Sequence, residues 1–260
     1  MVRRMLILGL LAMSVAAPGS HAQTAPAAAP AAAPPTVANA VDPASIQALK
    51  DMGAYLLSLK RFQVSSEVTG ERVLADGQKL QHSASARLDV VPPNKLHVVM
   101  TNAWSKRELF YDGKLVTLYF PAQKYYSQVE FTDRIGALIN RMEAKYGVEI
   151  PLEDMFLFGT PDANFDQFES AMNAGQAIVG GELCDHYAFR QKGLDWQLWI
   201  AAGGKPVPRK IVITNRADEA RPQSVSLITW NLKPAFTDAT FKFTPPKGST
   251  KIDMLPRKGQ

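Results

Sequence analysis

The sequence has a single cysteine among its 260 residues, Cys184, so no disulfide can form within the chain. The apolar run at residues 5–17 is too short to cross a bilayer, which takes about 20 residues. The net charge is only +5, and the basic residues are scattered rather than gathered in a stripe, so nothing indicates nucleic-acid binding. Cys184 alternates with His186 and Ala188 in a predicted strand, where we expect it to act as a small hydrophobe.

Catalytic motifs are also absent. The sequence contains no G-x-S-x-G, no H-E-x-x-H, no phosphate-binding glycine loop and no paired Cys-x-x-Cys. Asp185 and His186 are adjacent on a strand, so their side chains point to opposite faces and are not placed to act as a pair. The spacing of His82, His97 and His186 does not indicate a zinc site. We therefore expect a protein that is not an enzyme, with no catalytic residue, no metal and no cofactor.

The N-terminal 41 residues are predicted to lie outside the folded part of the chain. Arg3 and Arg4 precede the apolar run, and small residues follow up to Ala22, which is the pattern of a cleavable signal peptide over residues 1–22. Cleavage after Ala22 would release the protein into the periplasm without a transmembrane segment. Residues 23–41 are almost entirely Ala, Pro and Thr, which predicts an extended linker. One domain over residues 42–255 is then expected.

The first half of this domain is predicted to be one helix followed by six strands. Asp42 is a good N-cap and Pro43 is favoured at the first helical position, and apolar residues recur at three- and four-residue steps as far as Leu59. Period-two alternation follows, and Asp112-Gly113 is a hairpin signal. The predicted strands span residues 62–73, 80–91, 95–101, 106–111, 115–120 and 125–130.

A helical insert is predicted to interrupt the strands. Thr132 is expected to cap a helix that runs to residue 145, and Pro151 opens a second apolar stretch. The spacing of Phe165, Phe168 and Met172 suggests a third, short helical piece. The insert is more apolar than a solvent-exposed connection needs to be, so we expect it to lie against the sheet.

The sheet is predicted to resume in the second half and to have its centre there. In residues 182–215, three strands alternate apolar and polar residues, and Trp196, Leu198 and Ile200 form one apolar face. We expect this hairpin to run through the middle of the sheet. The full set of predicted strands covers residues 176–191, 194–201, 209–215, 224–232 and 240–243. Runs of strands around a helical block favour an α+β fold. The predicted architecture is a strongly curved antiparallel sheet, with the N-terminal helix and the insert covering its concave face.

Three short segments of the sequence form a pattern by their order and spacing: R-L-D-V-V-P-P-N-K-L at residues 87–96, F-Y-D-G-K at 110–114 and F-K-F-T-P-P-K-G at 241–248. They resemble the LolA family of periplasmic lipoprotein carriers and its LolB-like relatives. The segment D-W-Q-L-W-I-x-x-G-x-x-P-x-P-R-K at 195–210 is more similar to a family of predicted periplasmic proteins of unknown function. The resemblance implies an unclosed half-barrel with a helical lid over an apolar cavity. Pro92 stands where the carriers have an arginine, so the resemblance concerns the fold rather than lipoprotein carriage in particular.

The apolar residues of the insert leave two alternatives open. They are either a lid over a cavity that accepts acyl chains, or a plug that fills the half-barrel. The lid and cavity candidates are Leu138, Met142, Leu152, Met155, Phe156, Phe158, Trp196 and Leu198.

The first alternative predicts a secreted periplasmic binding protein for a lipid, a lipidated protein or another hydrophobic ligand. The second predicts a protein-interaction or envelope-stress sensing module that has a filled core and an envelope protein as its partner.

Overall fold

The computed structural model describes residues 40–152, 155, 158–160 and 163–257, which form two α-helices, a 3-10 helix and one sheet. The signal peptide and nearly all of the linker expected before residue 42 lie outside the described residues. The first half contains α1 Pro43–Ser58, β1 Phe62–Val73, β2 Lys79–Val91, β3 Lys95–Asn102, β4 Lys106–Tyr111, β5 Leu115–Phe120, β6 Tyr125–Glu130 and α2 Ile135–Tyr146. The second half contains β7 Ser170–Val179, β8 Glu182–Gln191, β9 Leu194–Ala201, β10 Pro208–Asn215, β11 Gln223–Asn231, η2 Asp238–Phe241 and β12 Thr250–Lys251.

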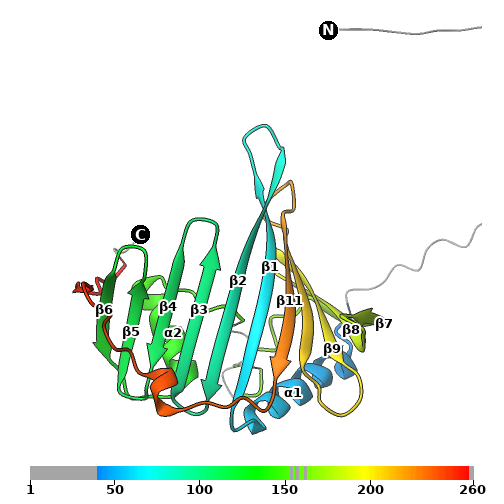
Figure 1. Cartoon of the computed structure of the whole chain (residues 1–260). Helices are drawn as coiled ribbons and strands as arrows, with labels where there is room; N and C mark the ends of the chain where they lie inside the picture. Colours follow the sequence, from blue (N-terminus) through cyan, green and yellow to red (C-terminus); the bar gives the residue numbers. More distant parts are fainter. Residues whose placement is uncertain (1–39, 153–154, 156–157, 161–162, 258–260) are drawn as a thin grey trace, which may run out of the picture. The chain divides into compact units, whose positions relative to one another are not determined.

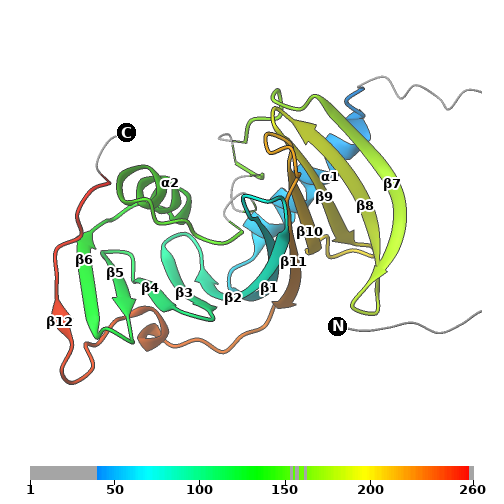
Figure 2. The ribbon, with the colours of Figure 1, turned by 90° about the horizontal axis from the view of Figure 1, so that it is seen from above.

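The strands form a single sheet in the order β12-β6-β5-β4-β3-β2-β1-β11-β10-β9-β8-β7. Consecutive hairpins account for most of the neighbours, and β1 joins the two halves by pairing antiparallel with β11. The expected α+β fold with a strongly curved, unclosed antiparallel sheet is confirmed (Figures 1 and 2). β12, which pairs in parallel with β6, departs from the antiparallel pattern.

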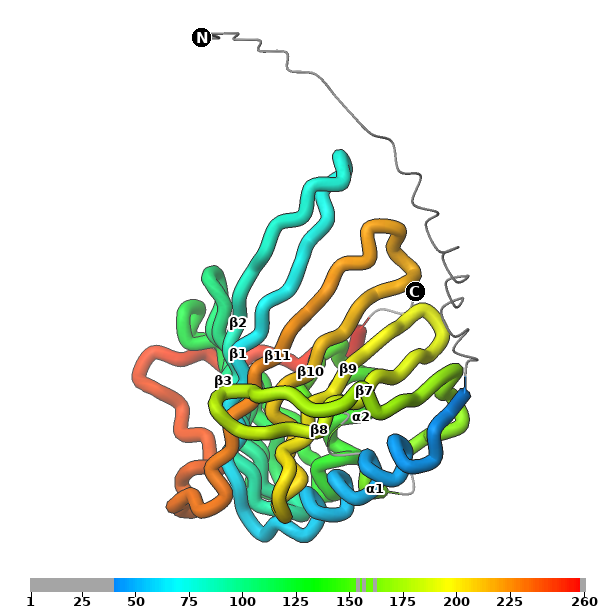
Figure 3. Tube along the Cα trace, turned by 90° about the vertical axis from the view of Figure 1, so that its right-hand side faces the viewer, coloured from blue at the N-terminus to red at the C-terminus, as the bar shows by residue number. Residues whose placement is uncertain are grey.

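The expectation about the centre of the sheet was wrong. The hairpin that carries Trp196 and Leu198 is β8–β9, near the β7 edge, while β1 and β2 lie in the middle. Sheet order depends on the long-range pairing of β1 with β11, which local alternation does not encode. Figure 3 shows that the central β1–β2 hairpin also projects past its neighbours.

The two helices cover different parts of the concave face (Figure 2). α2 lies over the β3–β6 half and buries Ile135, Leu138, Ile139 and Met142. α1 lies along the β7–β11 half, and Leu49, Met52 and Leu56 on its apolar face belong to the same core cluster. Its N-cap is the predicted one, because the Asp42 carboxylate accepts hydrogen bonds from the backbone N–H groups of Ala44 and Ser45. The insert therefore lies against the sheet, as its apolar composition predicted, because its helix α2 covers the β3–β6 half.

Two predictions about the helical insert were wrong. α2 begins at Ile135 after an N-cap at Arg134, so Thr132 does not cap it. No helix forms around Phe165 and Phe168, because Asn164 closes a local turn through its side chain, and Met172 lies in β7.

The remaining corrections concern strand assignments. The single strand expected over residues 176–191 is the β7–β8 hairpin, which turns at Gly180 and Gly181 with positive φ angles of 59° and 82°. The strand expected over residues 240–243 is replaced by η2, where Thr237 and Thr240 form a capping box.

After β11 the chain runs along the ends of the strands to β6 (Figure 1). The Lys95 ammonium binds the Asp238 carboxylate of η2 at 2.6 Å. Phe243 packs against the rings of Phe110, Tyr119 and Tyr126 with centroid distances of 5.1–5.4 Å. This C-terminal segment therefore covers the convex side of the β3–β6 half.

Candidate functional site

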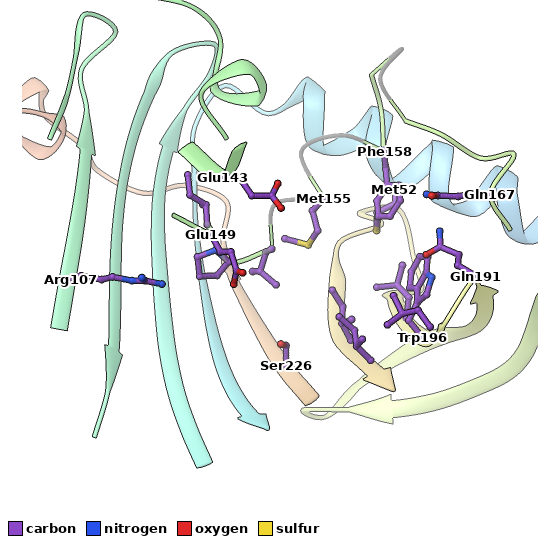
Figure 4. A pocket seen from close by; sticks show the side chains of 17 residues that line it. Met52, Arg107, Glu143, Glu149, Met155, Phe158, Gln167, Gln191, Trp196 and Ser226 are labelled. Carbon is purple, nitrogen blue, oxygen red and sulfur yellow. The ribbon is translucent and has the colours of Figure 1, made fainter. Parts of the chain in front are cut away.

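A cavity of about 440 Å³ lies on the concave side of the sheet, between the sheet and the helices (Figure 4). It is bounded by α1, by the segment that follows α2, and by strands from both halves of the sheet. The lining residues are Met52, Arg107, Glu143, Glu149, Ile150, Pro151, Leu152, Met155, Phe158, Gln167, Gln191, Leu194, Trp196, Leu198, Ile211, Ile213 and Ser226.

One end of this cavity is mainly apolar and aromatic, with Gln167 and Gln191 also on the side of Trp196 (Figure 4). Strand pairing places Trp196 beside Ile213 and Leu198 beside Ile211, so β9 and β10 present one continuous apolar wall. Trp196 is stacked on Phe158 at 5.9 Å with an interplanar angle of 13°, and on Phe189 at 4.3 Å. Such a wall gives a hydrophobic ligand a large contact area, and the stacking of the rings fixes the positions of the side chains that form it.

The other end carries charge. Arg107 of β4, Glu143 of α2 and Glu149 all line the cavity on the side away from Trp196 (Figure 4). The Arg107 Nε–H donates to the Met100 sulfur at 3.3 Å. An apolar cavity with a few convergent polar groups is typical of small-molecule sites, in which the polar groups fix the orientation of the ligand.

Two further cavities adjoin the first. A cavity of about 360 Å³ lies between the C-terminal end of α1 and the N-terminal end of α2, and Met155 lines both it and the first cavity. A cavity of about 260 Å³ lies along β2 and β3, and it shares Arg107 and Pro151 with the first. Met155 therefore lies where the first cavity meets the 360 Å³ cavity, and Arg107 lies where the first cavity meets the 260 Å³ cavity.

The predicted site residues fall into three groups. Those that line the first cavity are Leu152, Met155, Phe158, Trp196 and Leu198. Leu138 and Met142 are 0% and 1% exposed and pack in the core under α2, away from the cavity lining. Phe156 lies outside the described residues.

Sequence reasoning missed the charged and small residues of the site, including Arg107, Glu143 and Ser226. One signal was available for Arg107, because it occupies the same face of β4 as Leu109 and Tyr111, which are both fully buried. A charged residue in such a row is unusual without a partner. Glu143 carries no comparable signal, because exposed acids on a helix are common.

Metal-binding side chains do not gather in the described part of the chain. No cluster of three or more His, Cys, Asp or Glu side chains there is arranged to hold a metal ion. Cys184 is fully buried, and burial raises the pKa of its thiol, which disfavours the reactive thiolate. His186 contacts Gln197 through its ring Nε2 at 3.0 Å, while Asp185 accepts a hydrogen bond from Gln176.

The second tryptophan of β9 lies on the convex face. Trp199 is 7% exposed, because His186 stacks on it at 4.1 Å and the Lys210 ammonium lies 4.5 Å from its ring centre. With Cys184 and Val212 it forms a small separate core. Neighbouring side chains therefore cover Trp199, which leaves Trp196 as the aromatic residue of β9 that faces the cavity.

A family model described as "Predicted periplasmic protein (DUF2092)" matches residues 45–255. None of the curated proteins matches the chain. Similar solved structures include the Mycobacterium tuberculosis lipoprotein LppX, with 13% identity, a TM-score of 0.46 and coverage of 75% of this chain and 98% of that one. LprF from Mycobacterium bovis has 12% identity, a TM-score of 0.42 and coverage of 81% and 100%. A LolA superfamily protein from Nitrosomonas europaea has 11% identity, a TM-score of 0.35 and coverage of 76% and 98%.

Proposed function

The chain belongs to the family of predicted periplasmic proteins described as DUF2092, and we propose that it is a non-enzymatic binding protein that holds a hydrophobic ligand in the concave cavity. The ligand is a lipid, a lipidated protein or another apolar molecule. Residues 42–255 form the binding domain in this proposal. Export follows from the signal peptide pattern, with cleavage after Ala22, which N-terminal sequencing of periplasmic material tests. Within the described residues, no helix combines the length and the apolar composition needed to cross a bilayer.

The observation that carries the proposal is the 440 Å³ cavity itself. Its volume lies in the range of about 300–1,000 Å³ that small-molecule sites occupy. If the helical insert served only as a plug, it would fill the half-barrel. The buried side chains of α2 do not do so, because the cavity next to β9–β11 stays open. Each buried square ångström of an apolar ligand contributes about 25 cal/mol, so an acyl chain in this space is held without any specific polar contact.

A substitution that fills the cavity with a side chain tests this proposal. Ser226 of β11 points into the cavity floor (Figure 4), so Ser226→Phe places a ring where the ligand is proposed to lie. An aromatic residue suits a strand, so the fold is expected to tolerate the change. We expect saturable binding of a fluorescent acyl probe by the wild type, and at least about tenfold weaker binding by Ser226→Phe.

The matched control is Thr229→Phe on the same strand. Thr229 is exposed and three residues away from Ser226, so its side chain points to the opposite face of the sheet. This variant is expected to bind the probe like the wild type. If the wild type shows no saturable binding, the proposal fails, and a protein-interaction or envelope-stress sensing module with a filled core becomes the better hypothesis. Equal binding by Ser226→Phe and the wild type would place the ligand elsewhere.

A further inference from the structure

The charged end of the cavity is unusual for the face on which it lies. Leu109 and Tyr111 of β4 are fully buried on the concave side, and Arg107 is the next residue of that row. Its partner across the strand pair, Met100, is also buried. Arginine on an apolar face is expected to have an anionic partner, because an unpaired charge is costly to remove from water.

Arg107 has no such partner in the described part of the chain. Its Nε–H donates to the Met100 sulfur at 3.3 Å, and a thioether is a weak acceptor. None of the ion pairs found among the described residues includes Arg107, Glu143 or Glu149. The cavity is therefore lined by the half-buried Arg107 and by two solvent-exposed carboxylates, Glu143 and Glu149, and none of the three makes an ion pair within the described structure.

Arg107 also marks a change in the character of the lining. It stands at the junction of the first cavity with the 260 Å³ cavity, whose wall includes the polar residues Ser85, Thr101, Asn102 and Ser105. On the other side, the first cavity extends to Trp196. A molecule that lies across the junction meets polar groups at one end and an aromatic wall at the other, which is the arrangement that an amphiphile fits.

We propose that the ligand is a zwitterionic amphiphile of the phosphoethanolamine type. Its phosphate binds the Arg107 guanidinium, its ammonium group is held by Glu143 and Glu149, and its acyl chain lies against Trp196. This inference rests on the proposed function, because it names the class of ligand for the same cavity. Arginine matches phosphate geometry through paired N–H donors, and charge-assisted hydrogen bonds of this kind are the strong ones.

The sign of the charges decides among headgroups. A purely anionic headgroup would gain Arg107 but would face two carboxylates, and a purely cationic one would be repelled by Arg107. A neutral glycerol headgroup would leave all three charges unmatched. Only a headgroup that carries both charges satisfies both parts of the wall.

The test compares ligands with one acyl chain in common, titrated calorimetrically into the mature protein. The ligands are lysophosphatidylethanolamine, lysophosphatidylglycerol and a monoacylglycerol, together with glycerophosphoethanolamine as the headgroup without a chain. We expect the ethanolamine lipid to bind at least about tenfold more tightly than the other two lipids, and the free headgroup not to bind measurably.

Variants of the charged lining residues separate the contribution of Arg107 to lipid binding from that of Glu143 and Glu149. Arg107→Gln is expected to weaken binding of the ethanolamine lipid about tenfold or more and to leave monoacylglycerol within about twofold. The double variant Glu143→Gln, Glu149→Gln is expected to close most of the gap between the ethanolamine and glycerol lysolipids. Arg61→Gln, at an exposed arginine outside the cavity, is the control and should bind all ligands like the wild type. Circular dichroism checks that each variant is folded.

The outcomes distinguish this inference from the proposed function. Equal affinity for all three lipids, or an Arg107→Gln variant that still prefers the ethanolamine lipid, would overturn the headgroup assignment and leave an unselective hydrophobic site. Tight binding of the free headgroup would show that a soluble phosphoethanolamine compound, and not a lipid, is the ligand. Absence of binding by all of the ligands would overturn the proposed function together with this inference.

Discussion

His97 is held between two carboxylates on the convex face of the sheet. Its ring Nδ1 lies 3.3 Å from an Asp89 oxygen and its Nε2 lies 3.2 Å from a Glu108 oxygen. Both carboxylates accept hydrogen bonds, so this arrangement favours the imidazolium form, in which both ring nitrogens donate. Burial alone would lower the pKa of His97, but the hydrogen bonds to Asp89 and Glu108 outweigh it and raise the pKa above 6.5. The hydrogen bond from His97 lowers the pKa of Glu108 to about 2, against the opposing effect of burial.

These shifts predict how stability depends on pH. The raised pKa of His97 adds stability that is complete below pH 6.5 and is lost as pH rises through the folded-state value. The lowered pKa of Glu108 adds stability that is complete above pH 4.5 and is lost as pH falls toward 2. We expect His97→Gln to lower the free energy of unfolding by about 1.5–3 kcal/mol at pH 6 and by less at pH 9.

Urea denaturation of wild type and variant at both pH values measures this difference. His82→Gln, at an exposed histidine of β2, is the control and is expected to change the free energy of unfolding by less than about 0.5 kcal/mol. A loss at His97 that is the same at pH 6 and pH 9 would show that the ring acts by packing and not by charge.

At the scale of residues, the sequence predicts apolar positions better than charged ones. Trp196 and Leu198 were identifiable as members of one apolar strand face, and both line the cavity. Leu138 and Met142 have the same apolar signal but lie in the core, because a helical stripe does not show which part of it meets a cavity. Arg107 and Glu143 line the cavity because β4 and α2 lie on the same concave face as β9–β11, and no local sequence pattern contains that arrangement.

At the scale of elements, α1 and the helical insert contact each other through the backbones of two glycines, Gly53 and Gly159. A Cβ atom built on Gly53 would lie within 3.0 Å of the backbone of Phe158 and Gly159, and one built on Gly159 would meet the backbone of Gly53 equally closely. Glycine costs about 1 kcal/mol in a helix interior relative to alanine, so its place in the middle of α1 needs a reason. The close backbone approach supplies one, and it also positions Phe158 against Trp196.

This contact predicts the sign of a substitution. Without the contact, Gly53→Ala would stabilise α1 by about 1 kcal/mol. With it, we expect a loss of about 1–3 kcal/mol in the free energy of unfolding, together with weaker binding of the acyl probe, because Phe158 must move. Urea denaturation and probe titration measure the two effects. Ala54→Leu, at the exposed neighbouring position, is the control and should change neither. A stabilised Gly53→Ala variant would contradict the proposed contact.

The strands differ in how well the sequence predicts them. The bounds of β4, β5 and β6 match the predicted ranges, and Asp112-Gly113 marks the turn between β4 and β5. β7 was assigned only in part, since Ser170–Val179 is an edge strand with small and polar residues and little apolar alternation. η2 was mistaken for a strand because Phe241 and Phe243 alternate with Lys242, which is the period-two pattern of a strand.

In the molecule as a whole, the pairing of β1 with β11 decides where the cavity lies. It brings β4 of the first half and β9–β11 of the second half to one concave face, although Arg107 and Trp196 are 89 positions apart in the sequence. α1 and α2 each cover one part of that face, and the space that they leave between them is the cavity (Figures 2 and 4). The sequence predicted both helices and the sheet, but the division of the face between the helices follows from the topology.

This division predicts which part of the protein is the least stable. α2 has no side-chain hydrogen bond at its N-cap, while β1 is hydrogen-bonded to a strand on each side. We therefore expect the amides of α2 to exchange with solvent faster than those of β1, and to slow down when an acyl probe fills the cavity that Glu143 of α2 lines. Hydrogen-exchange mass spectrometry with and without the probe measures both effects. Ser226→Phe is the control, since the probe should not protect α2 when the cavity is blocked. Protection of α2 equal to that of β1, and unchanged by the probe, would mean that the insert is a fixed part of the core.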